Sequence, residues 1–189
     1  TRVVDSDAET LRALCGARSD RDVLTHARWV EVLGREALSI RFYRSLERAV
    51  SGLAASSSTA TSAIRAEIAL LNTSRLLFLS FLQAKGWLNG DSAFLVRHYE
   101  RCVDGRSKFH HNVLRPLFFG TLNTPLRRRA AAARAFGRIP FLNGGLFSQT
   151  LIERRHRTVA FSDDAYGRLI YDVFGQYRFT AREESSTWS

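Results

Sequence analysis

Arginine is the residue type through which this sequence could do chemistry, and it gathers in two places. The first cluster comprises Arg127, Arg128, Arg129 and Arg134, and the second comprises Arg154, Arg155 and Arg157. Planar guanidinium groups fit phosphate oxygens, and such contacts give affinity for nucleic acid without reading its sequence. The clusters therefore predict phosphate contacts along double-stranded DNA. A solvated helix face that pairs with an acidic neighbouring domain would show the same pattern, and no aromatic residues interleave to indicate base stacking.

The overall charge points the same way. The chain of 189 residues has 28 basic and 18 acidic residues, and its net charge is +10. An excess of this size attracts polyanions without specifying a fold. Nucleic-acid contact is the favoured interpretation, and a basic surface that meets an acidic partner is the alternative.

Residues suited to catalysis or metal binding form no convincing group. The neighbouring carboxylates Asp163 and Asp164 stand where a helix start favours negative charge, so we interpret them as capping residues. His98 and Cys102 are four residues apart, but the paired spacing of a zinc site is missing. We therefore predict no catalytic residue and no metal site in this chain.

Nuclease and nucleotide-binding motifs are also missing. The chain has only two lysines, and neither follows an acidic residue at the short spacing that a metal-dependent nuclease uses. The sequence Asn143, Gly144, Gly145 is not a phosphate-binding glycine loop. We predict that it forms a tight structural turn, where two backbone segments cross closely.

The same composition suggests a soluble location. The longest apolar run, residues 76–82, is too short to span a bilayer, and the N-terminus lacks a signal-peptide layout. We therefore predict a cytoplasmic chain with no membrane partner, in which Cys15 and Cys102 are free thiols. The polar ends, with no initiator Met, suggest a piece cut from a longer polypeptide.

Apolar spacing predicts a mainly α, bundle-like domain with a small irregular or β element near residues 139–162. Apolar residues recur every three or four positions from residue 35 and again over residues 63–85, where Gly86 should end the helix. Further helices are predicted over residues 109–122, 126–136 and 162–174, and hairpin-like strands over residues 150–161. The expected organisation is a poorly defined segment at 1–34, a helical scaffold at 35–180 with a flexible link at 51–62, and a polar tail at 181–189.

Five segments together resemble part of a known family. They are REALSIRFYRSLERAV from residue 35, SRLLFLSFLQAKGWL from residue 74, LFFGTLNTP from residue 117, IPFLNGGLF from residue 139 and YRFT from residue 177. In this order they resemble the helical spacer that precedes the methyltransferase domain in large bacterial adenine-specific DNA methyltransferases. These are the type IIG restriction–modification enzymes and the related methylases of phage-defence systems.

The resemblance implies a role that is not catalytic. The family's S-adenosylmethionine loop and its NPPY-type motif have no counterpart here, since NTPL at Asn123 lacks the second proline and the aromatic residue that stacks on a flipped base. No cofactor is expected in this chain, and S-adenosylmethionine is expected in the parent protein. The implied role is to position the methyltransferase domain of the same parent chain on DNA. The alternative is a purely structural or protein-docking module whose basic face meets an acidic partner domain.

Overall fold

A computed structural model describes residues 22–142 and 144–176, with side chains from residue 39 onward. The chain divides into two compact units, Thr1–Ser45 and Leu46–Ser189. The first described helix, α2 (Asp22–Ala55), contributes residues to both units. The predicted segment 1–34 lies mostly outside the described residues, and the predicted tail at 181–189 lies wholly outside them, so this division of the chain stays a prediction.

The described part of the second unit is mainly helical, which confirms the mainly α class. No strand occurs in residues 22–142 or 144–176. After α2 the order is α3 (Ser62–Ala84), α4 (Phe94–Asp104), η1 (His110–Leu114), η2 (Pro116–Leu122), η3 (Leu126–Arg128), α5 (Ala131–Arg134), η4 (Gly145–Phe147), α6 (Leu151–Arg155), α7 (Asp163–Arg168) and η5 (Leu169–Phe174). The predicted strands over residues 150–161 are therefore wrong, because that stretch begins with α6.

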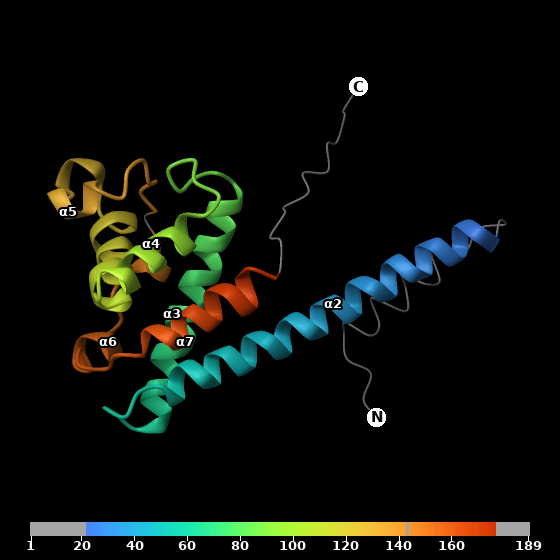
Figure 1. Ribbon diagram of the computed structural model, residues 1–189, viewed down its shortest axis with the longest axis horizontal. Helices are drawn as coiled ribbons and strands as arrows, with labels where there is room; N and C mark the ends of the chain where they lie inside the picture. The colour runs from blue at the N-terminus through green and yellow to red at the C-terminus, as the bar shows by residue number, and fades with distance from the viewer. Residues whose placement is uncertain (1–21, 143, 177–189) are drawn as a thin grey trace. The chain divides into compact units, whose positions relative to one another are not determined.

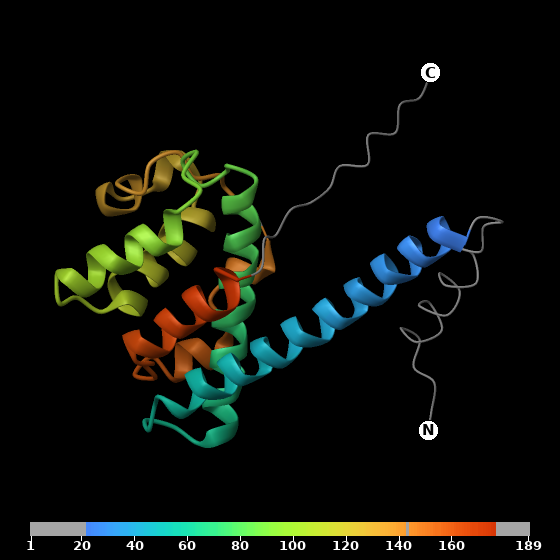
Figure 2. The ribbon, with the colours of Figure 1, turned by 45° about the vertical axis from the view of Figure 1, so that its right-hand side comes forward.

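Helix α3 is the element around which the second unit packs. Figures 1 and 2 show it running along the length of the unit, with the later helices gathered beside it. It contacts α4, α6 and η5. Leu76, Leu79 and Leu82 are completely buried on it. As predicted, the helix ends just before Gly86, which has a positive φ, a left-handed conformation that favours glycine.

The serine-rich segment expected to be a flexible link is shorter and better anchored than predicted. Helix α2 continues to Ala55, so only residues 56–61 connect it to α3. The Arg65 side chain donates hydrogen bonds to the carbonyl oxygens of Ala54 and Ala60. One guanidinium on α3 thus holds both ends of the connection. Thr61 caps the helix by accepting from the Ile64 amide, as a residue at this position commonly does.

Several later helices are wound as π-helices, which are rare as complete elements. The predicted helix over residues 109–122 is present, but it consists of η1 and η2, with Pro116 at the first position of η2. The predicted helix from Ser162 is also present, as α7 continued by η5. Ser162 is the N-cap of α7, since its side chain accepts from the Ala165 amide, and Asp163 and Asp164 lie in the first turn.

Gly167 on α7 offers a test of this packing, because the ring of Tyr99 occupies the space that a side chain would need. A Cβ atom added to Gly167 would lie 2.9 Å from Tyr99 Cζ, whereas one added to Gly120 would make an ordinary 3.6 Å contact with Ala133 Cβ. We expect Gly167→Ala to lower the free energy of unfolding by at least about 1 kcal/mol through overpacking. Gly120→Ala is the matched control and should be neutral or stabilising. Urea denaturation of both variants measures the difference, and equal stability of the two would contradict this packing.

Among the described residues, no helix combines the length and the apolar character that crossing a membrane would require.

Candidate nucleic-acid interface

The first arginine cluster does not lie on a single helix, although one helix is predicted over residues 126–136. The sequence LRRRAAAARAF contains the short helix η3, a break at residues 129 and 130, and the single-turn helix α5. Arg127, Arg128 and Arg134 are exposed. Among the described residues, no carboxylate pairs with any of these three side chains, although Arg134 donates from Nε to the Arg129 carbonyl. They remain candidates for phosphate contact.

Arg129 leaves the predicted DNA-contacting set because its side chain is only 3% exposed. Its guanidinium donates to three backbone carbonyl oxygens, those of Thr124 (3.0 Å), Ile139 (2.9 Å) and Pro140 (3.1 Å). These bonds tie the segment before η3 to the segment after α5. Arg129 is therefore a structural residue, and its extended backbone (φ −69°, ψ 131°) breaks the predicted helix at this point.

The second cluster lies on α6 and the turn that follows it. Arg154, Arg155 and Arg157 are all exposed. Helix α6 packs against α3, while α5 packs against η2, and the two helices lie apart in both views of the ribbon (Figures 1 and 2). The two clusters are therefore separate basic patches and not one continuous stripe.

The two described glycines of the predicted turn, Gly144 and Gly145, do not lie against another segment. Asn143 lies outside the described residues. Gly144 bends the chain into the short helix η4, and its amide donates to the Leu142 carbonyl. A Cβ atom added to Gly144 or Gly145 would meet nothing within 4 Å, so space does not demand glycine at either position.

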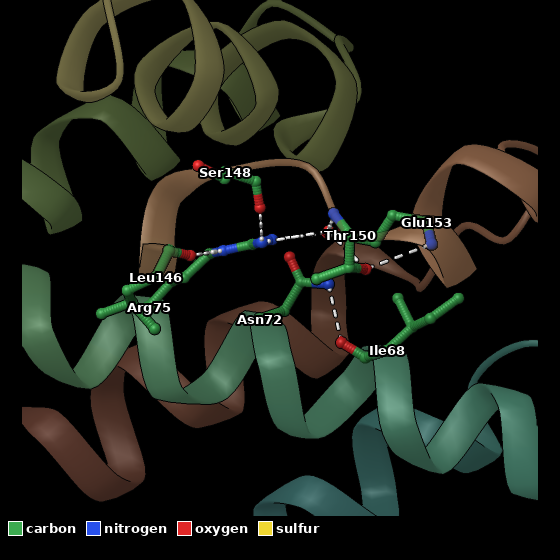
Figure 3. Close-up of polar contacts among 7 residues, drawn as sticks. All are labelled: Ile68, Asn72, Arg75, Leu146, Ser148, Thr150 and Glu153. Carbon is green, nitrogen blue, oxygen red and sulfur yellow. Dashed lines mark hydrogen bonds and ion pairs between the residues drawn. The ribbon is translucent and has the colours of Figure 1, made fainter. Parts of the chain in front are cut away.

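The residue that holds this turn in place is Arg75, which the sequence analysis does not single out. Arg75 lies on α3 and is completely buried. Its Nε atom donates to the Leu146 carbonyl at 2.7 Å, and Nη2 donates to the Ser148 carbonyl at 3.0 Å (Figure 3). Both terminal nitrogens also donate to the carboxylate of Glu153 on α6, which makes a two-pronged ion pair.

Glu153 has a second role at the start of α6. Thr150 and Glu153 form a capping box, in which each side chain accepts from the other's backbone amide. Burial opposes ionisation of Glu153, but hydrogen bonds from Arg75 and Thr150 outweigh it, so its pKa lies below the ordinary value. The ionised carboxylate therefore caps α6 and neutralises Arg75 at once.

The sequence carries a signal for each half of this arrangement. The pattern Thr150-x-x-Glu153 is a capping-box signature, and it indicates a helix start in place of the predicted strands. Arg75 is the only charged residue of α3 after Glu67, and the apolar run Leu76–Leu79 follows it directly; a charge on a buried face requires a partner. What the sequence could not show is that the partner lies 78 residues away.

No group of three or more potential metal ligands from His, Cys, Asp and Glu occurs in the described part of the chain. His98 lies between aromatic rings, with centroids 4.3 Å from Phe94 and 5.3 Å from Phe136. Cys102 is a buried free thiol next to the hydroxyl of Ser107. Both side chains belong to the packing of α4.

Comparison with known proteins adds one relative. The chain is similar to a protein of Methanocaldococcus jannaschii named as a candidate type II restriction enzyme and methyltransferase, with 31% identity over 119 residues. The match covers 60% of this chain and 10% of the relative, so the chain spans about a tenth of the protein that it resembles. No family model and no solved structure matches the chain.

Proposed function

We propose that this chain is a non-catalytic helical segment of a DNA adenine methyltransferase from a restriction–modification or phage-defence system. The observation that carries the proposal is the similarity to one tenth of a protein named as a restriction enzyme and methyltransferase. A match to so small a part of a large protein suits an internal segment. S-adenosylmethionine and the reaction then belong to other parts of the parent protein, and the cytoplasm remains the predicted location.

In this proposal the chain positions the methyltransferase domain of the same parent on double-stranded DNA. The exposed arginines that support this role are Arg127, Arg128, Arg134, Arg154, Arg155 and Arg157. Since none of them forms an ion pair within the described residues, their positive charge is available to phosphate. Contacts of this kind fix a protein on the duplex and leave sequence reading to other parts.

The salt dependence of DNA binding tests this proposal. If all six arginines contact phosphates, the slope of log affinity against log salt should be about −5, and affinity should fall by roughly 10³-fold between 50 and 200 mM salt. Fluorescence anisotropy with a labelled duplex measures the slope. Removing two contacts with Arg154→Gln and Arg155→Gln should reduce its magnitude by about 2. Undetectable binding at low salt, or binding that ignores salt, would contradict DNA contact.

A second candidate, the docking module, has its own supporting observation. An open groove beside the first cluster is lined by Trp87 and Leu126, whose side chains are 55% and 66% exposed, together with Arg138. Apolar surface next to unpaired cations suits an acidic partner domain.

Charge reversal separates the two candidates. In the variant Arg127→Glu/Arg128→Glu, a DNA-contacting role predicts loss of DNA affinity with intact association to the methyltransferase domain. Docking predicts the opposite pattern. Arg129 is left unchanged, because its replacement would break the buried bonds to three carbonyl groups.

A further inference from the structure

A narrow cleft beside the Arg75–Glu153 pair has the chemistry of a phosphate site. Residues from η1, from the junction of η1 and η2, from α6 and from the turn after α6 line it. The polar lining residues are His110, Arg115, Gln149, Glu153, His156 and Arg157. Four of these six carry cationic or imidazole side chains, and they come from two segments that are distant in the sequence.

No carboxylate among the described residues balances the positive charge of this cleft. Glu153 is the only acidic residue in its lining, and both carboxylate oxygens already accept hydrogen bonds from Arg75, with Thr150 as a further donor. Arg115 and Arg157 form no ion pair with any described residue. Arg75 neutralises Glu153, so the two free guanidinium groups leave the cleft with an excess of cations.

His110 lies in the lining of this cleft and is affected by the charges around it. Its ring stacks on Tyr166, with centroids 6.0 Å apart. Its pKa is lowered to about 4, chiefly by burial and then by Arg115, while Glu153 acts in the opposite direction. An anion in the cleft would raise the pKa of His110, because a nearby negative charge favours the protonated imidazole.

The size of the cleft restricts what can enter. Its interior volume of about 20 Å³ accommodates one water-sized group, so a base or a sugar cannot enter it. A single phosphate oxygen can enter the cleft, while the other oxygens of the group remain outside it, near the exposed Arg157. The two guanidinium groups in the lining, those of Arg115 and Arg157, suit this tetrahedral anion.

We propose that this cleft binds one phosphate group, with Arg115 and Arg157 as the charged donors and the His156 ring as a further donor beside them. The proposal deepens the proposed function and depends on it for one point, that the phosphate belongs to the DNA backbone. Free phosphate has the same chemistry, so the experiment must distinguish the two sources.

Imidazole NMR of the whole chain provides that distinction. The histidine ring resonances are followed while either inorganic phosphate or a short DNA duplex is added, in the wild type and in Arg115→Gln, Arg157→Gln and Arg154→Gln. Arg154 is the matched control, since it is exposed on α6 and does not line the cleft. Arg157 lies on a surface turn, so its replacement keeps the test valid if Arg115→Gln fails to fold.

The expected result is that duplex DNA shifts the resonances of His110 and His156. Arg115→Gln and Arg157→Gln should abolish these shifts, weaken DNA binding by about threefold to tenfold and reduce the salt slope by about 1 each. Arg154→Gln should weaken binding similarly but keep the shifts. The variants at the cleft and the control then differ in the imidazole signal and not merely in affinity.

The other outcomes separate the two proposals. Shifts with inorganic phosphate but not with DNA would support the phosphate site and overturn its assignment to the DNA backbone. Salt-dependent DNA binding with unmoved imidazole resonances would overturn the phosphate site and leave the proposed function standing. If the chain shows no DNA binding and no imidazole shifts, both the phosphate site and the proposed function are overturned.

Discussion

Replacing Glu153 with glutamine is expected to lower the free energy of unfolding by about 3–5 kcal/mol, the largest effect of any single change proposed for this chain. The substitution keeps the shape of the side chain but leaves the guanidinium of Arg75 charged, completely buried and without a counterion. It also weakens the cap of α6, because a neutral amide accepts hydrogen bonds less strongly than a carboxylate. Urea denaturation followed by circular dichroism measures the loss.

Two further variants show whether the ion pair is the cause. Arg154→Gln changes the next residue of α6, which is exposed, and should alter stability by less than about 0.5 kcal/mol. The pair Arg75→Met and Glu153→Gln should be strongly non-additive, since each change alone strands the other partner. Additive costs, or a loss below about 1 kcal/mol in Glu153→Gln, would show that this contact does not hold the unit together.

The second large effect is a loss of stability between pH 6.5 and pH 4 caused by His110. Its pKa falls from an ordinary 6.5 to about 4 in the folded chain, chiefly through burial and then through Arg115. In this window the unfolded chain binds the proton and the folded chain does not, so stability decreases as the pH falls. At pH 5 the loss is on the order of 2 kcal/mol.

The variant His110→Gln checks this assignment, because its side chain cannot titrate. Its stability should fall less than that of the wild type between pH 6.5 and pH 4. His98 also has a pKa lowered by burial, so His98→Gln is the matched comparison and should remove a separate contribution of the same sign. Glu153 acts at lower pH, since its pKa is lowered from the ordinary 4.5 and its contribution is lost only as the pH falls below that value. An unchanged pH profile in His110→Gln would contradict the burial of this ring.

The helices that could be predicted from the sequence are those whose boundaries are set by local chemistry. Gly86 ends α3 because it can adopt a positive φ, and Ser162 begins α7 because its hydroxyl accepts from the Ala165 amide. Both signals are short in range, so no knowledge of the fold was needed. The start of α6 at Thr150 is equally local, and the strand prediction fails there because it weighs an apolar pattern above a capping box.

The remaining differences arise from contacts between distant segments. Residues 126–136 have a strong helix propensity, but no continuous helix forms there. The buried guanidinium of Arg129 instead binds the carbonyl oxygens of Thr124 and Ile139. Arg75 on α3 is a second example, because the carboxylate that it binds lies 78 residues later in the chain. Exposed and buried arginines look alike in a sequence, so the phosphate-binding candidates could be narrowed only after burial was known. The cleft at Arg115 could not be predicted either, because its lining residues come from segments that are distant in the sequence.

The separation between Arg75 and Glu153 in the sequence also means that Arg75 is synthesised well before its counterion. A ribosome adds roughly 5–20 amino acids per second, so Glu153 follows Arg75 after an interval on the order of 4–16 s. During that interval the guanidinium has no counterion, so the inner face of α3 must stay in contact with water. We therefore expect the core around Arg75 to close only after Glu153 has been made, because a buried guanidinium without a counterion is costly.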